Sequence, residues 1–240
     1  MNKTYLVFVL GSFCIGFMST TQGMGLRSFV ALPVEKQGAV IRLAFEHTKD
    51  ADTDSLTTSA AYGLSSKQTL LFGFPYRLSP AGDNRQGDLS FLYRHIIIQD
   101  DSSSGTNRLG LLGGVIIPTD NDRDLAIQAG FVFTHFKNRH EIDIDALYQA
   151  GLDDRPDSGR YDLSWQYRLS PVEYPEWGIA QEWYSILELN GRWRKGRSVT
   201  HQLTTGLQWV HQTWVLEAGI AKDLNNEKEL RYLLNSRFHF

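Results

Sequence analysis

Polar and apolar side chains alternate through residues 141–150, which read EIDIDALYQA. An alternation with a period of two places the two sets on opposite faces of a β-strand. One face of this strand would carry Ile142 and Ile144, and the other would carry Asp143 and Asp145. Because about ten residues are what a tilted strand needs to cross hydrocarbon, the stretch predicts a membrane-crossing strand with one greasy face and one charged face.

The same alternation recurs along the chain after residue 23. No linker divides the chain, and its only internal repetition is the regular succession of strands and turns. We therefore expect one all-β domain over residues 24–240. We predict about twelve antiparallel strands in up-and-down order. Their expected ranges are 37–47, 55–65, 68–78, 87–98, 107–117, 124–136, 139–152, 159–169, 182–193, 199–210, 213–222 and 229–240.

The two faces decide between a soluble and a membrane barrel. Aromatic residues make up 12% of the chain, and they fall mainly on the apolar faces of the expected strands. A closed interior could not hold all of these rings, whereas an outward position makes them a lipid-facing band with aromatic girdles. Closure also pairs every backbone group, which hydrocarbon requires. We therefore predict a transmembrane β-barrel of the outer membrane, with a soluble lipocalin-like barrel as the alternative.

The first 23 residues have the pattern of a secretory signal peptide. Lys3 precedes an apolar run over residues 5–17, and small residues at Thr21 and Gly23 suit cleavage after Gly23. The alternative is a membrane-anchoring helix, for which the run is short. The single cysteine, Cys14, lies inside this segment, so the exported chain would contain no disulfide.

The connections suggest which end of the barrel faces outward. If the N-terminus begins in the periplasm, the polar links at 48–54, 79–86 and 118–123 face outside, whereas 66–67 and 137–138 form very short periplasmic turns. Long outer loops and short periplasmic turns are typical of such barrels. Two periplasmic links, expected at 100–106 and 170–181, are longer than this pattern.

The chain ends in an alternating strand in which Leu230, Tyr232, Leu234, Phe238 and the C-terminal Phe240 share a face. This strand resembles the C-terminal signature of outer-membrane proteins. The resemblance implies that Tyr232, Phe238 and Phe240 form an assembly signal and that the barrel-assembly machinery is a partner.

A second resemblance lies in LGLLGGVIIPT, residues 109–119. This stretch is similar to a strand end in the transporter-like family named for the meta-cleavage pathway of phenol degradation. The resemblance spans roughly residues 107–150, and Asp120 stands where the family has glycine. It implies an outer-membrane barrel that passes small, often aromatic, compounds and that has no defined catalytic residues.

If the apolar faces point outward, charges of both signs line an enclosed lumen. The expected lumen-lining residues are Arg42, Glu46, Arg94, Glu141, Asp143, Asp145, Arg160, Asp162, Arg168, Glu188, Arg192, Arg231 and Arg237. Because an unpaired buried charge is costly, we expect cross-strand ion pairs, among them Glu141 with Arg168 and Glu46 with Arg231. About twelve strands predict a narrow bore whose charges set its selectivity. The alternative is a network that plugs the lumen.

Three carboxylates, Glu141, Asp143 and Asp145, share one strand face and offer the oxygen ligands that calcium prefers. They are too spread out to close one coordination shell, so Arg160 or Arg168 is the favoured partner. We therefore assign no metal and no cofactor.

A lipid hydrolase of the outer membrane is the enzymatic alternative. His47 and His201 fall near the outer end, with Ser55 and Ser198 nearby, but no serine, histidine and acid stand at a spacing that would form a triad. Six histidines have outward parity, where an imidazole suits the headgroup interface: His47, His95, His135, His140, His201 and His211. The net charge of -3 and the lack of a basic stripe exclude a nucleic-acid partner. We expect a non-enzymatic channel for small solutes, some aromatic or hydrophobic, surrounded by outer-membrane lipids.

Overall fold

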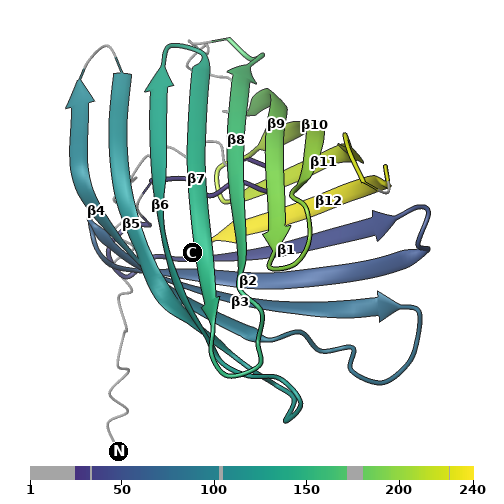
Figure 1. Cartoon of the computed structure of the whole chain (residues 1–240). Helices are drawn as coiled ribbons and strands as arrows, with labels where there is room; N and C mark the ends of the chain where they lie inside the picture. Colours follow the sequence, from purple (N-terminus) through teal and green to yellow (C-terminus); the bar gives the residue numbers. More distant parts are fainter. Residues whose placement is uncertain (1–24, 33, 103–104, 172–180, 227) are drawn as a thin grey trace, which may run out of the picture.

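Twelve antiparallel strands close into a single barrel (Figure 1). This computed structural model describes residues 25–32, 34–102, 105–171, 181–226 and 228–240. The expected signal peptide therefore lies outside the described residues. The strands are β1 (Ala39–Thr48), β2 (Thr53–Ser65), β3 (Gln68–Ser79), β4 (Leu89–Ser102), β5 (Gly105–Ile117), β6 (Ala126–Lys137), β7 (His140–Gly151), β8 (Ser158–Arg168), β9 (Glu182–Arg194), β10 (Thr200–Val210), β11 (Trp214–Asp223) and β12 (Leu230–His239).

Each strand pairs with its sequence neighbours, and β1 pairs with β12 to close the ring. The predicted up-and-down barrel of about twelve strands is thus confirmed. Every strand boundary lies within four residues of its expected position. In the described part of the chain, no helix has the length and apolar character needed to span a membrane.

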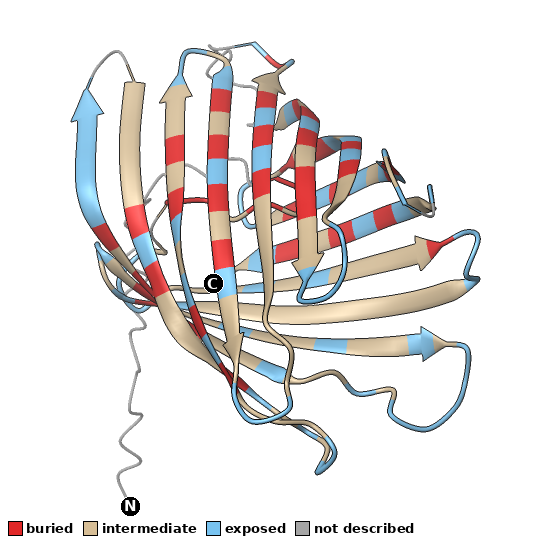
Figure 2. Ribbon diagram, in the orientation of Figure 1, coloured by how far each residue is buried: buried red, intermediate tan, exposed pale blue. Residues whose placement is uncertain are grey.

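The apolar face of the strands points outward and the polar face points inward. Ile144 and Leu163 are 38% and 43% exposed on the outer surface, while Asp143, Asp145 and Asp162 are fully buried inside. Buried and exposed bands accordingly alternate along β7 and β8 (Figure 2). This is the reverse of a soluble barrel, and it excludes the lipocalin-like alternative.

Aromatic rings gather near both ends of the outer surface. At one end, Trp209 stacks on Trp183 with ring centroids 5.5 Å apart and meets Trp214 edge-on at 4.7 Å. At the other end, Tyr148 stacks on Trp193 at 6.2 Å. Two such belts are typical of barrels whose ring-bearing ends lie at membrane interfaces.

The connections differ between the two ends. After even-numbered strands, β2–β3, β4–β5 and β6–β7 are joined by two residues each, and β10–β11 by three. Connections after odd-numbered strands span four to nine residues. We call these the short-turn end and the long-loop end.

One expected connection is wrong. The link predicted at 100–106 is largely strand, because β4 continues to Ser102, which pairs with Gly105 of β5. Arg108 and Asp101 join these two strands through an ion pair of 2.9 Å. The other long connection, 169–181 between β8 and β9, contains residues 172–180, which lie outside the described part.

Candidate functional site: a lumen crossed by residues 25–32

Residues 25–32, which precede β1, lie inside the barrel rather than beside it (Figure 1). We call them the lumen segment. Leu26, Ser28, Val30 and Ala31 are each 3% exposed or less. The segment forms no strand, so its backbone groups must find partners other than a β-ladder.

Inward-facing side chains accept hydrogen bonds from the backbone N–H groups of the segment. The Phe29 N–H donates to Oδ2 of Asp145 at 2.7 Å, and the Ala31 N–H donates to Oγ1 of Thr134 at 2.8 Å. Closer to its start, the Arg27 N–H donates to Oε2 of Glu188 at 3.1 Å. Acceptors on β7, β6 and β9 thus replace a neighbouring strand.

Inward-facing donors bind the carbonyl groups of the segment. Nη2 of Arg94, on β4, donates to the Leu32 carbonyl at 2.6 Å, and the same guanidinium also binds the Val30 carbonyl. From β12 and β1, Nδ2 of Asn235 donates to the Leu26 carbonyl at 3.1 Å, and Arg42 binds that carbonyl as well. The segment is therefore held on both sides of the lumen.

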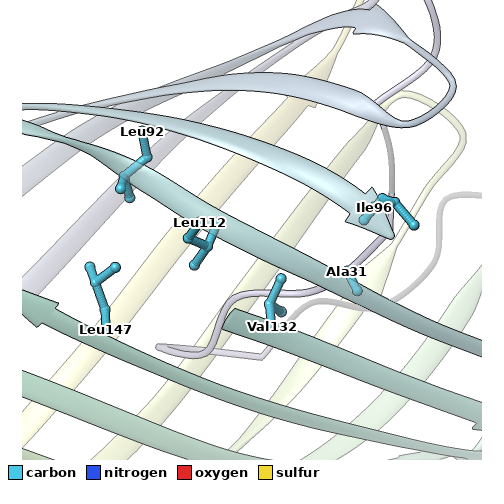
Figure 3. Close-up of a cluster of buried hydrophobic side chains, with 6 residues drawn as sticks. All are labelled: Ala31, Leu92, Ile96, Leu112, Val132 and Leu147. Atoms are coloured by element: carbon cyan, nitrogen blue, oxygen red, sulfur yellow. The ribbon is translucent and has the colours of Figure 1, made fainter. Parts of the chain in front are cut away.

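The inner wall of β4–β7 is apolar where the segment passes. Ala31 joins a buried cluster from these four strands, shown in Figure 3. The wall residues of this cluster are Leu92, Ile96, Leu112, Val132 and Leu147. The lumen therefore has one apolar side in addition to its charged side.

A second apolar contact fixes the start of the segment. Leu26 packs with Ile186, Ala221 and Leu233. Its Cδ1 atom occupies the space where a Cβ atom would stand on Gly206 or on Gly219, at 2.7 and 2.6 Å. The absence of side chains at these two glycines creates the seat for Leu26.

The longer side chains of the segment contact charged groups. Nη1 of Arg27 donates to Oε1 of Gln202 at 2.6 Å, and its guanidinium pairs with Glu46. The Arg160 guanidinium lies 4.1 Å from the centre of the Phe29 ring. Such a cation–π contact suits an arginine that is shielded from water.

Six of the thirteen residues expected to line the lumen contact the lumen segment: Arg42, Glu46, Arg94, Asp145, Arg160 and Glu188. The expected pair of Glu46 and Arg231 is present at 3.2 Å. The expected pair of Glu141 and Arg168 is wrong, because Arg168 pairs with Glu182 at 2.6 Å. Both carboxylate oxygens of Glu141 are buried without a hydrogen-bond partner among the described residues.

The three-carboxylate face of β7 meets hydrogen-bond donors and arginines. Asp143 accepts from Thr134 at 2.6 Å and from Gln166 at 2.9 Å. Arg160 lies 3.8 Å from Asp145 and 3.7 Å from Asp162. Within the described residues, no group of three acidic, histidine or cysteine side chains is placed to hold a metal ion.

One carboxylate connects several elements. Glu217 accepts hydrogen bonds from Arg237 at 2.6 Å, Gln208 at 2.7 Å, Asn235 at 2.9 Å and Arg42 at 3.1 Å. Asn235 and Arg42 also bind the Leu26 carbonyl. Glu217 therefore links β10, β12 and β1 to the lumen segment.

The lumen opens at the long-loop end into a polar vestibule of about 600 Å³. Arg27 of the lumen segment is part of its lining, and Glu46, Arg192 and Arg231 are among its charged wall residues. Arg197, from the turn between β9 and β10, completes the rim. The vestibule therefore presents charges of both signs next to Arg27 of the lumen segment.

The two histidines near the long-loop end do not form a hydrolytic site. Nδ1 of His47 bonds Asp54 at 2.8 Å, and Nδ1 of His201 bonds the Tyr161 hydroxyl at 2.6 Å. Among the described residues, no serine hydroxyl is hydrogen-bonded to either ring, so the serine–histidine pair of a nucleophilic site is not formed at these two histidines. Tyr161 instead places His201 among the aromatic rings of this end.

Sequence reasoning missed the lumen segment. Residues 25–32, GLRSFVAL, carry one charge and no alternation, so the sequence pattern predicts no strand there. A usable signal was present: an apolar stretch that lies outside every predicted strand of an exported chain still needs burial.

Comparison with known proteins identifies the fold. No family model and no curated protein sequence matches the chain. The COG4313 outer membrane channel from Pseudomonas putida F1 is similar in structure, with a TM-score of 0.57 and 16% identity over 88% of this chain and 98% of that one. The KdgM porin is also similar, with a TM-score of 0.51 and 9% identity over 84% of this chain and 99% of that one.

A second KdgM structure, described as a complex with disordered oligogalacturonate, gives a TM-score of 0.52 at 8% identity over 84% of this chain and 99% of that one. At these identities the likeness establishes fold. The phenol-pathway family suggested by residues 109–119 is not confirmed. The chain has the closed β-barrel fold found in outer-membrane channels and porins.

Proposed function

We propose that the protein is an outer-membrane channel that passes small solutes through a narrow lumen. The observation that carries this proposal is a closed barrel with an apolar exterior and a polar vestibule of about 600 Å³ leading to its interior. Its likeness in fold to channels and porins supports the same role. The long-loop end would face the outside and the short-turn end the periplasm.

Small solutes with an apolar part, aromatic compounds among them, fit the inner surface best. The apolar wall of β4–β7 faces acidic and amide side chains across the lumen. A solute moving along this wall would keep its polar group near charges and its ring near Leu92 or Leu112. Residues 25–32 fill this path, so a resting channel would conduct weakly.

Single-channel recording of the refolded chain, residues 24–240, in planar bilayers tests the proposal. Small, ion-selective conductance steps are the expected result. A barrel that folds, as judged by its heat-modifiable migration, but never conducts would instead identify a plugged structural barrel.

Replacing Arg197 with glutamate should move the reversal potential in a salt gradient toward cation selectivity. Arg197 lines the vestibule, is exposed and forms no ion pair within the described residues, so the substitution changes local charge by two units without breaking a salt bridge. Rings of charge near a pore set which ions enter it. Lys49→Glu, in the exposed turn between β1 and β2, makes the same charge change outside the vestibule lining and serves as the control. Equal shifts in the two variants would argue against the vestibule as the entry.

We also propose that export and assembly use the two ends of the chain. The barrel-assembly machinery would read Tyr232, Phe238 and Phe240, which are 44%, 41% and 77% exposed on the outer surface. Residues 1–23 would direct export and be removed. Neither proposal depends on the solute.

A further inference from the structure

Arg94, on the inner face of β4, is a buried cation that is bound to neutral groups. It is 4% exposed. Its guanidinium donates to the carbonyls of Val30 and Leu32 and to Oγ1 of Thr69, the last at 3.1 Å. In the described part of the chain, no carboxylate lies within salt-bridge distance of this guanidinium, and its Nε atom has no hydrogen-bond partner. A buried cation that is held by neutral acceptors would gain from an anionic one.

Two other arginines that contact the lumen segment have carboxylates beside them. Arg42 also binds a carbonyl of the segment, but it pairs with Glu217 at 3.1 Å. Arg160, whose guanidinium lies over the Phe29 ring, is 3.8 Å from Asp145. Arg94 therefore differs from both, because no described carboxylate compensates its buried charge.

Arg94 lies within the apolar wall of β4–β7, whose side chains Figure 3 shows. Leu92 and Ile96 flank it on the same face of β4, and Leu112 is its partner on β5. A Cβ atom on Gly110 would lie 3.4 Å from Cγ of Arg94 and 3.0 Å from Cδ1 of Ile96, so this glycine makes room for both side chains. A cation in an apolar wall suits a ligand that carries one negative charge and an apolar body.

The lumen segment occupies this place with a similar combination of groups. The carbonyl oxygens of Val30 and Leu32 bind the guanidinium. Ala31 belongs to the apolar cluster of β4–β7, and the Phe29 ring packs against that cluster. Two oxygen atoms on a guanidinium and a ring on an apolar wall are the contacts that a small ring-bearing carboxylic acid would make. The segment therefore imitates such a ligand with its own backbone and side chains.

We propose that Arg94 and the apolar wall of β4–β7 form a binding site for a monocarboxylate with an apolar ring, and that this solute competes with the lumen segment for the site. The carboxylate takes the place of the two carbonyls on the guanidinium, and the ring takes the place of Phe29 or Ala31 on the wall. An arginine–carboxylate pair is charge-assisted and can be bidentate, so it is stronger than the neutral bonds that it replaces. A ligand that binds only the displaced state shifts the equilibrium toward that state, which opens the path that residues 25–32 fill.

The covalent link between the segment and β1 determines the concentration at which the solute acts. A tethered group competes at an effective concentration on the order of millimolar, so a free carboxylate is expected to act in the same range. Weak binding suits a channel, because a tightly bound solute would leave too slowly to be conducted. The inference rests on the proposed channel function, for which it names the class of solute.

Release of the lumen segment can be measured with a single cysteine. Residues 24–240 contain no cysteine, so Ala31→Cys introduces one thiol at a position that is fully buried in the apolar cluster. The refolded barrel is reacted with N-ethylmaleimide, and the labelling rate is followed by intact mass spectrometry. Millimolar benzoate should raise this rate severalfold, because it releases the segment. Benzyl alcohol, which has the ring without the charge, and acetate, which has the charge without the ring, should have little effect at the same concentration.

Two arginine substitutions in the Ala31→Cys background identify the site. Arg94→Gln and Arg42→Gln each remove a guanidinium that binds a carbonyl of the segment, but Arg42 has Glu217 as a partner and Arg94 has no described carboxylate. Benzoate should still accelerate labelling in Arg42→Gln and not in Arg94→Gln. Saturation-transfer NMR of benzoate, which detects contact rather than release, should show binding by Arg42→Gln and none by Arg94→Gln. Heat-modifiable migration verifies that each variant folds.

Equal acceleration by benzoate and benzyl alcohol, or by benzoate and acetate, would overturn the proposal without any substitution at Arg94. So would a response to benzoate in Arg94→Gln as large as that in Arg42→Gln. Conductance is recorded separately on the parent chain. A barrel that conducts but does not respond to benzoate would refute the class of solute alone, whereas a barrel that responds to benzoate without conducting would refute the channel and leave the binding site.

Discussion

Deleting residues 25–32 from the exported chain should raise its single-channel conductance severalfold. The segment crosses the lumen and is bound by side chains of β1, β4, β6, β7, β9 and β12. Without it, Asp145, Glu188 and Thr134 would face an open space with polar walls, which water can enter. Ion flow depends on the narrowest part of a pore, so opening this part should have the largest effect of any change proposed for the lumen.

A replacement variant separates the sequence of the segment from its length. Residues 25–32 are exchanged for eight residues of glycine and serine, which keep the chain length but lose Arg27, Phe29 and the Leu26 contact. We expect conductance above that of the parent chain, with frequent brief closures as the tether enters and leaves the lumen. A deletion variant that folds yet conducts no more than the parent would show that another constriction limits flow.

The strands were predictable because each of them carries its own evidence. In β7, charged and apolar residues alternate. A shift of one residue in the pairing would move all the apolar side chains to the polar face, so the alternation alone predicts both the strand and the face each residue occupies. The end of β4 shows the limit of this reasoning. Residues 99–102 are all polar, so no periodicity marks them as strand, and pairing with Asn107 and Arg108 of β5 extends the hairpin instead.

An ion pair was predictable from the sequence only where the pairing of neighbouring strands is enough to bring the two side chains together. Glu46 and Arg231 meet because barrel closure sets β1 beside β12, where Thr48 is opposite Arg231. Glu141, in contrast, is opposite Gln166 on β8, and Arg168 lies beside β9, where it reaches Glu182. Which diagonal neighbour a long side chain selects depends on its rotamer, and sequence spacing does not contain that information.

The binding partners of the lumen segment were beyond sequence reasoning for a different reason. Its partners Thr134, Asp145 and Glu188 are more than 100 residues away, and they face one another only after the ring closes. Before closure, Asp145 is one carboxylate of a charged face, and its role as a backbone acceptor has no local signature. The sequence therefore predicts which residues face inward. It does not predict which of them bind the lumen segment and which only line the lumen.

Substituting Glu217 with alanine should destabilise the barrel by about 3–5 kcal/mol, the cost of leaving a buried charge without its partner. Arg237 and Glu217 are both fully buried, and their pair of 2.6 Å is the central contact of a group that includes Arg42. Loss of the carboxylate would leave the Arg237 guanidinium in a site with no carboxylate at salt-bridge distance in the described structure. Urea unfolding in lipid vesicles, followed by tryptophan fluorescence, measures the change in free energy.

Asp101→Ala is the matched control, because it removes the carboxylate of a single pair with Arg108 at an exposed hairpin. That variant should change the free energy of unfolding by no more than about 1 kcal/mol, as is usual for exposed pairs. If Glu217→Ala lowers the free energy of unfolding by no more than this control does, then water reaches the Arg237 guanidinium and the lumen next to β11 and β12 is hydrated.

A double variant separates lost charge pairing from lost packing. The double variant Glu217→Met, Arg237→Leu removes both buried charges while keeping much of the side-chain volume. Exchange of a buried ion pair for apolar residues is often neutral, so this variant should recover most of the stability that Glu217→Ala loses. Recovery would show that the cost lies in the stranded guanidinium. Failure to recover would instead assign the cost to the remaining bonds of Glu217, those with Arg42, Gln208 and Asn235, which tie the wall to the lumen segment.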